Sequence, residues 1–221
     1  MEYIVRIIGI REVTHDVKSF RFEKPAGYQF IPGQATDVSI NKPAWKEEKR
    51  PFTFTCLNED PYLEFTIKRY SDHHGVTDQL HQLGPGDELI IRDVWGAIAY
   101  NGPGYFFAGG AGITPFISIL RQLRKDGGIR GNTLFFSNKT SADIIYEQEL
   151  SDMLGHQARF ILTKEDKAGY EHGYINEGFI RQNAPDLKKK FYVCGPDPMI
   201  ADIRTILEKL GVEPDTVVFE K

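Results

Sequence analysis

The sequence predicts a two-domain β plus α/β protein, with a six-stranded antiparallel barrel followed by an α/β domain built on a parallel sheet. Three observations predict this architecture. Residues 3–93 hold six short segments rich in Ile, Val, Thr, Phe and Tyr, with turn residues between them. From residue 105 onward, short apolar runs alternate with helical stretches. The turn-rich stretch 100–104 lies where the pattern changes, so we expect domains at 1–101 and 102–221.

The first half is predicted to be almost entirely β-structure. Its expected strands are 3–13, 17–23, 34–40, 50–57, 62–70 and 88–93. Apolar and polar residues alternate within several of them, as in 63–68, which indicates strands with one face on a core. Short strands at this spacing favour an antiparallel sandwich or barrel. One helical insert is expected at 77–83.

The second half is predicted to alternate strands and helices. Strands are expected at 105–108, 133–137, 159–163, 191–194 and 217–219, and helices at 115–125, 146–154, 176–182 and 198–210. In the last helix, apolar residues from Met199 to Leu210 recur on one face. Repeated strand–helix units predict a parallel sheet that is covered on both faces.

Composition excludes several classes of protein. The 27 Lys and Arg residues against 31 Asp and Glu residues give a net charge of −4, which excludes a nucleic-acid or membrane-surface binder driven by bulk charge. Cys56 and Cys194 are too few for a disulfide framework, a four-cysteine zinc site or a four-cysteine iron–sulfur cluster. We see no signal peptide, and glycines and a proline interrupt the apolar stretch 105–120. We therefore expect a cytoplasmic protein without a membrane span.

A glycine-rich turn joins the first strand of the second half to its helix. The run Gly109-Gly110-Ala111-Gly112-Ile113-Thr114-Pro115 lets the backbone approach a ligand closely. The N–H groups of the following helix then suit a pyrophosphate or a flat cofactor ring. The turn departs from the usual dinucleotide fingerprint because Pro115 replaces the third glycine. Ser137, Asn138 and Lys139, instead of an acidic residue, end the next strand. A tight turn without a ligand is the structural alternative.

Two segments of the first half carry groups that suit a phosphate. Arg50-Pro51-Phe52-Thr53 offers a guanidinium, an aromatic ring for a flat ligand and a hydroxyl. His74-Gly75-Val76-Thr77 opens a helix whose N–H groups and hydroxyl suit a phosphate. An exposed arginine and a plain helix cap are the structural alternatives. We expect no metal at His73 and His74, because adjacent residues on extended backbone point to opposite faces.

A second strand-to-helix segment lies near the C-terminus. Cys194-Gly195-Pro196-Asp197-Pro198-Met199 follows an apolar strand and begins a helix at its prolines. Cys194 is therefore expected at the carboxyl end of a parallel strand, where open α/β sheets bind ligands. A buried, inert cysteine is the structural alternative.

Taken in order, these segments resemble the ferredoxin–NADP reductase superfamily over essentially the whole chain. Residues 50–53 are similar to its Arg-x-Tyr-Ser/Thr motif, with Phe52 in place of the commoner Tyr, and 75–77 resemble its Gly-x-Ser/Thr turn. Residues 109–115 are similar to its Gly-Gly-x-Gly-Ile-Thr-Pro signature and 194–199 to its Cys-Gly-Pro-x-x-Met signature. Residues 93–96 depart from its Gly-Pro-x-Gly. Glu220 and Lys221 follow Phe219, so the terminal Tyr of plant-type members is missing.

The resemblance implies a flavin-binding barrel, a nucleotide-binding α/β domain, and FAD and NAD(P)H as cofactors. For the flavin it implies contacts from Arg50, Pro51, Phe52, Thr53, Lys68, Tyr70, Gly75, Val76, Thr77 and Phe219. For the nicotinamide dinucleotide it implies Gly110, Gly112, Thr114, Ser137, Lys139, Cys194, Gly195, Pro196 and Met199. Thr53, near the reactive edge of the flavin, and Cys194, near the nicotinamide, are the candidate catalytic residues. Transfer between stacked rings depends on orientation and requires no acid or base.

The implied function is a flavin-dependent oxidoreductase that takes a hydride from NAD(P)H onto FAD. Single electrons then pass to a separate carrier such as flavodoxin or ferredoxin, because too few cysteines are present for an iron–sulfur relay. A free-flavin or ferric reductase of the same superfamily is one alternative, and a non-catalytic flavin- or nucleotide-sensing module is another. Lys139 is the nearest candidate to bind the 2′-phosphate of NADPH, with Arg159 and Lys164 further away.

Overall fold

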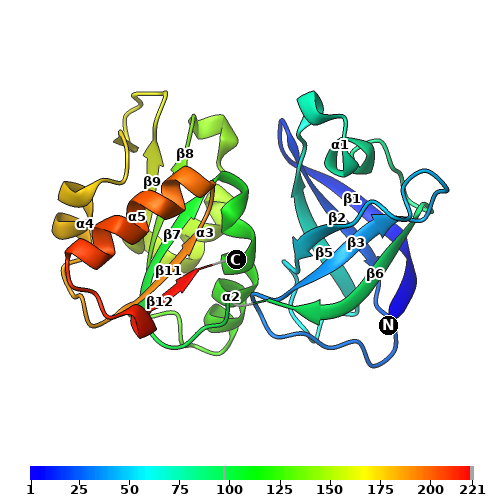
Figure 1. Cartoon of the computed structure of the whole chain (residues 1–221), viewed down its shortest axis with the longest axis horizontal. Helices are drawn as coiled ribbons and strands as arrows, with labels where there is room; N and C mark the ends of the chain where they lie inside the picture. Colours follow the sequence, from blue (N-terminus) through cyan, green and yellow to red (C-terminus); the bar gives the residue numbers. More distant parts are fainter. Residues whose placement is uncertain (97, 220–221) are drawn as a thin grey trace.

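The computed structural model describes residues 1–96 and 98–219, which form two six-stranded sheets lying side by side (Figure 1). The first sheet is antiparallel and the second is parallel, as the sequence predicts. Ala97, Glu220 and Lys221 lie outside the described residues. Among the described helices, none has the length and apolar character needed to cross a membrane.

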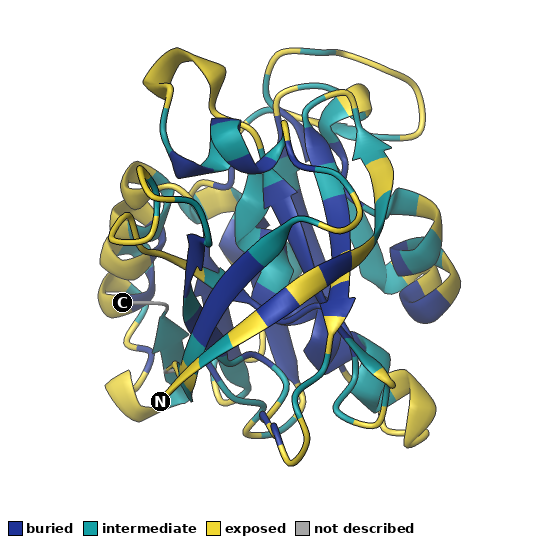
Figure 2. Cartoon of the chain, turned by 90° about the vertical axis from the view of Figure 1, so that its right-hand side faces the viewer, coloured by how far each residue is buried: buried dark blue, intermediate teal, exposed yellow. Residues whose placement is uncertain are grey.

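The first six strands form the barrel, in the order β4–β3–β6–β1–β2–β5. They are β1 Glu2–Thr14, β2 Val17–Glu23, β3 Ala35–Ile40, β4 Arg50–Thr53, β5 Tyr62–Lys68 and β6 Glu88–Trp95. A bridge between Phe54 and Phe65 brings the two ends of the sheet together. The first residues of β1 alternate between exposed and buried (Figure 2), so one face of the strand lines a core rich in phenylalanine.

Two predicted elements of the first half extend three or more residues past the ends of the observed ones. β4 ends at Thr53 instead of residue 57, because the chain then crosses to β5 and the Leu57 N–H turns to the Asp60 carboxylate at 2.8 Å. Helix α1, Val76–Leu80, ends before residue 83 because the N–H groups of Gln82 and Leu83 bond three residues back.

The second sheet has the order β10–β9–β8–β7–β11–β12. Its strands are β7 Gly104–Gly109, β8 Thr133–Asn138, β9 Ala158–Leu162, β10 Glu171–His172, β11 Lys190–Cys194 and β12 Val217–Phe219. Its helices are α2 Thr114–Lys125, α3 Glu147–Leu154, α4 Glu177–Asn183 and α5 Asp197–Lys209. Strand β10 has no counterpart among the predicted strands, because two residues are too few to show a period.

The strands of the second sheet are buried on both faces. Phe106 packs with residues of α2 and α3, whereas its neighbour Phe107 packs with residues of α4 and α5. This explains why the strands read as continuous apolar runs. The chain runs from β7 to β8 on one side of the sheet, while β11 pairs with β7 on the other side. Such a reversal opens a crevice at the carboxyl ends of β7 and β11, where ligands bind in open α/β sheets.

Candidate functional site

A cavity of about 860 Å³ lies between the two halves of the chain. Its walls come from β4, β5 and α1 of the barrel and from the turns after β7, β8 and β11. Its volume is typical of a site for a small molecule or cofactor. The predicted site residues that line it are Pro51, Phe52, Thr53, Lys68, Tyr70, Thr77, Gly110, Gly112, Thr114, Ser137, Lys139, Cys194, Gly195, Pro196 and Met199.

The glycine-rich turn after β7 packs directly on the segment after β11. A Cβ atom on Gly112 would lie 2.5 Å from the carbonyl carbon of Cys194 and 2.6 Å from the Cα of Gly195. A Cβ atom on Gly109 would lie 2.6 Å from the sulfur of Met199. Cβ atoms in proteins essentially never lie closer than 3.0 Å to such atoms. These two glycines are therefore required for two strand ends to meet, and the turn and the Cys194–Met199 segment form one packed unit.

The barrel side of the cavity presents Phe52, Thr53, Lys68 and Tyr70. The Phe52 ring packs 5.9 Å from Phe65, and Thr53 is buried at the end of β4. The ammonium of Lys68 is paired with Asp16 at 2.6 Å. Burial alone would raise the pKa of Asp16, but Lys68 holds that pKa below its usual value. Lys68 therefore reaches the cavity as one half of an ion pair.

Four predicted site residues do not line this cavity. Arg50 is exposed, and its guanidinium donates to the Lys49 carbonyl at 2.6 Å. Val76 is buried in the barrel core, and Gly75 caps α1. Phe219 lies on β12 beside β11, with the Arg204 guanidinium 4.5 Å from its ring. The pairing of β12 places Phe219 against the core beside α5, and its stacking on a flavin stays a prediction.

Several residues outside the predicted cofactor-binding and catalytic sets also line the cavity. They include Thr66, Trp95, Asn138, Asp143, Thr163, Tyr174 and Asp202. Asn138 is 5% exposed, and both its Oδ1 and its Nδ2 lack a hydrogen-bond partner within the structure. Asn138 and Thr163 stand at the carboxyl ends of adjacent parallel strands, so extending the strand-end rule to polar neighbours finds them. Thr66 and Trp95 carry no comparable sequence signal.

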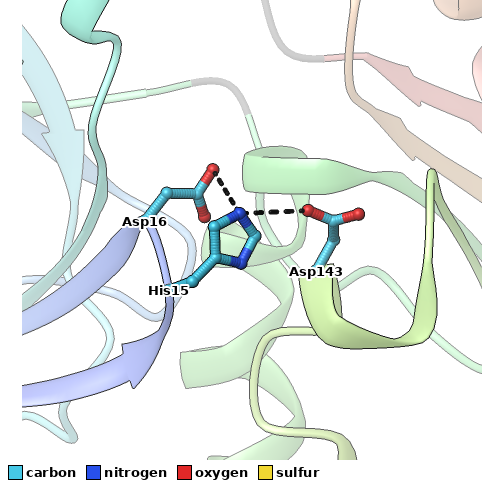
Figure 3. Close-up of side chains that lie close together, drawn as sticks. All are labelled: His15, Asp16 and Asp143. Carbon is cyan, nitrogen blue, oxygen red and sulfur yellow. Dashed lines mark ion pairs between the residues drawn. The ribbon is translucent and has the colours of Figure 1, made fainter.

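A polar contact joins the halves beside this cavity (Figure 3). His15 Nε2 lies 3.7 Å from a carboxylate oxygen of Asp16 and 3.7 Å from one of Asp143. Both carboxylates already have partners, since Asp16 pairs with Lys68 and Asp143 accepts the N–H of Thr140 at 2.8 Å. His15 is 61% exposed. We interpret the three residues as a bridge between the β1–β2 hairpin and the turn after β8.

Two family models match consecutive parts of this architecture. The oxidoreductase FAD-binding domain matches residues 5–100, and the oxidoreductase NAD-binding domain matches residues 106–205. The chain belongs to the ferredoxin–NADP reductase superfamily. The predicted family and fold class are therefore confirmed.

Solved structures share the fold of this superfamily member. The FAD/NAD-binding domain of nitric oxide dioxygenase from Vibrio cholerae aligns with a TM-score of 0.87 at 19% identity, over 98% of this chain and 97% of that one. A ferredoxin NADP⁺ reductase from Neisseria gonorrhoeae with bound FAD and NADP aligns with a TM-score of 0.81 at 17% identity, over 99% and 98%.

Sequence relatives of this superfamily member have various named roles. The reductase component of propane 2-monooxygenase from Rhodococcus jostii is 27% identical over 98% of this chain and 62% of its own length. NADH-cytochrome b5 reductase 2 from Mycosarcoma maydis is 27% identical over 94% of this chain and 69% of its own length. The chain thus spans about two thirds of the length of these relatives.

The cavity fits the two cofactors that the matched domains bind. Its walls come from both domains, so a flavin on the barrel side and a nicotinamide on the α/β side would share one space. Gly110 and Gly112 of the turn line the cavity without side chains, which lets a ligand approach backbone atoms closely. The unpaired amide of Asn138 marks a wall where polar ligand atoms are expected.

Proposed function

We propose that this chain is an NAD(P)H-dependent flavoprotein reductase that passes single electrons to a separate carrier such as flavodoxin or ferredoxin. The observation that carries the proposal is that Phe52 and Thr53 of the barrel line the same cavity as the Gly112 turn and Cys194 of the second domain. Bound there together, FAD and NAD(P)H would supply the hydride and electron chemistry. The contribution of the protein is to hold the reactants in place.

Each wall of the cavity has a proposed role in this reaction. Phe52 would lie along the flavin ring and the Thr53 hydroxyl would bond near its reactive edge, as the resemblance implies. Thr77 would bind a flavin phosphate, and Arg50, which precedes the cavity residue Pro51, would join it by turning its guanidinium away from the Lys49 carbonyl. The Gly112 turn and Cys194 would form the back wall for the nicotinamide. We also propose the domain boundary after residue 101, in the connection between β6 and β7.

The proposal is tested by mixing the purified protein with NADH in the absence of oxygen. We expect a yellow protein whose flavin absorbance bleaches rapidly, and whose extracted flavin runs as FAD in chromatography. FMN alone would contradict the FAD assignment. A yellow protein that NADH does not bleach would favour a non-catalytic sensing module, and a colourless protein that cannot be reconstituted would contradict flavin binding.

The acceptor is tested by following electrons out of the reduced protein. Flavodoxin, ferredoxin, cytochrome b5, a ferric chelate and free FMN would be offered in parallel under NADH and under NADPH. We expect one protein carrier to be reduced at least about tenfold faster than the ferric chelate or free FMN, because a docked carrier is held near the flavin edge. The reverse order would favour the free-flavin or ferric reductase alternative.

Lys139 is expected to bind the 2′-phosphate of NADPH. It is exposed at the end of β8 and lines the cavity. The variant Lys139→Glu should raise the Michaelis constant for NADPH about tenfold or more while changing that for NADH much less, because only NADPH carries the extra phosphate. The exposed Lys188→Glu variant makes the same change in net charge outside the cavity lining. Equal effects of Lys139→Glu on both cofactors would contradict this role.

A further inference from the structure

Helix α2 connects the glycine-rich turn to the barrel. It begins at Thr114, directly after the turn Gly110–Ile113, and lies between the two sheets (Figure 1). The Oγ of Ser118 accepts the N–H of Gly33 from the barrel at 3.1 Å, in a buried contact. Arg121 follows three residues later and falls on the same side of the helix. Both Ser118 and Arg121 contact the barrel. The barrel therefore holds α2 at two points that lie within two turns of the start of the helix at the cavity.

Arg121 uses its whole guanidinium to join three elements. Its Nη1 donates to the carbonyl of Thr55 at 2.5 Å and to the Glu64 carboxylate at 3.1 Å, both on the barrel. Its Nε and Nη2 donate to the two carboxylate oxygens of Glu149 on α3, at 2.6 and 2.9 Å. The Glu64 side chain is 2% exposed and also accepts from Arg21 at 2.9 Å. A planar fork with partners on two sides fixes orientation as well as distance.

The same contacts reach the wall of the cavity. The Thr55 hydroxyl lies 3.1 Å from the Glu64 carboxylate and 3.1 Å from the hydroxyl of Thr66, which lines the cavity. The Thr66 hydroxyl lies 3.0 Å from the phenol oxygen of Tyr146, and the Arg121 guanidinium lies 5.1 Å from the Tyr146 ring. One hydrogen-bonded set therefore links the barrel wall of the cavity to the helix that follows the opposite wall.

We propose that Arg121 and Glu64 are positioning residues that fix the distance between the Gly110–Ile113 turn and the flavin side of the cavity. This inference rests on the proposed reductase function. Transfer between two rings is steeply sensitive to geometry, and a misplacement of about 1 Å can lower a rate about 100-fold. A shift of α2 at Arg121 moves the turn at the head of the same helix. The pair acts through the backbone that it holds and touches neither reacting ring.

The test measures flavin reduction at saturating NADH, by stopped flow, in the FAD-loaded full chain. The variant Arg121→Met keeps an unbranched side chain but removes the guanidinium. We expect the limiting rate to fall at least about tenfold, while the Kd for NADH and the FAD content change less than about threefold. The long-wavelength charge-transfer absorbance of NAD⁺ stacked on reduced flavin should weaken as well. Arg121→Lys, which keeps the charge without the fork, should recover part of the rate.

Lys125→Met is the matched control, because it removes a cation from the next turn of α2. Lys125 pairs with Glu59 on the barrel, and both side chains are about half exposed, so this variant should keep the wild-type rate within about twofold. Equal rates in Arg121→Met and Lys125→Met, or a loss of thermal stability alone, would overturn the positioning role. If Arg121→Met does not fold, Arg121→Lys takes its place and must still be slower than Lys125→Met. A wild-type protein that NADH does not bleach would instead overturn the proposed function itself.

Discussion

Replacing Gly112 by alanine should lower the limiting rate of flavin reduction by NADH about 100-fold. The new Cβ atom would lie 2.5 Å from the carbonyl carbon of Cys194 and 2.6 Å from the Cα of Gly195. Both obstacles are backbone atoms at the end of β11, so no side-chain rotation relieves the clash. The turn and the β11 segment must separate, which moves the proposed back wall of the nicotinamide site.

Stopped-flow reduction of the FAD-loaded variant measures this effect, and flavin absorbance shows whether the barrel keeps its cofactor. We expect the FAD content to stay near that of the wild-type protein, because Gly112 belongs to the second domain. Gly84→Ala is the control, since a Cβ atom there meets nothing within 4 Å. A Gly112→Ala variant that is reduced at the wild-type rate would contradict the tight contact as a requirement of the site.

This contact gives two sequence signatures one physical basis. The Gly109–Pro115 and Cys194–Met199 segments are about 80 residues apart in the chain, yet β7 and β11 pair in parallel and bring their carboxyl ends together. Gly109 lies against Met199, and Gly112 lies against Cys194 and Gly195. The glycines of the first segment are therefore needed for its contact with the second segment, whatever ligand the turn binds.

Hydrophobic periodicity predicts the fold because burial repeats at every strand and helix. The apolar runs around Phe106 and Phe135 reflect burial on both faces. The alternation in 63–68 predicts a strand with one buried face, but all of residues 63–67 are buried, because Glu64 and Thr66 contact Arg121 and Tyr146 of the second domain. Where local hydrogen bonds decide an element's end, as at Leu57 or Leu83, periodicity does not reveal it. The position of Phe219 depends on which strand pairs with the three-residue strand β12. The sequence alone does not specify that partner.

The cavity lining is partly predictable, because turns at the carboxyl ends of parallel strands share one edge of a sheet. The Arg121–Glu64 pair is not predictable in this way. Its members are 57 residues apart and belong to different domains, and Thr66 meets Tyr146 across 80 residues. Nothing in the local sequence distinguishes these charges from those of exposed ion pairs. Their importance comes from burial, which only the folded arrangement reveals.

Glu64→Gln is expected to lower the free energy of unfolding by about 3 kcal/mol, as removing one partner of a buried ion pair does. The Glu64 side chain is 2% exposed and faces Arg121 and Arg21. A neutral amide leaves the Arg121 charge with Glu149 as its remaining carboxylate partner. Urea unfolding at pH 7 measures the loss. Glu59 forms an exposed pair with Lys125, also between the barrel and α2. Glu59→Gln should lower the free energy of unfolding by less than about 1 kcal/mol.

The difference in the free energy of unfolding between the wild-type protein and Glu64→Gln should depend on pH. Burial alone would raise the pKa of the Glu64 carboxyl, but Arg121 and Arg21 hold that pKa below its usual value of 4.5. The unfolded chain therefore binds this proton at a higher pH than the folded protein does. The stabilisation is fully present above the unfolded pKa and is lost as the pH falls through the folded pKa. The stability difference between wild type and Glu64→Gln should thus be constant from about pH 6 to 8 and shrink below about pH 4.5. A difference that stayed constant into this acid range would show that the charge of Glu64 contributes nothing to the joint between the domains.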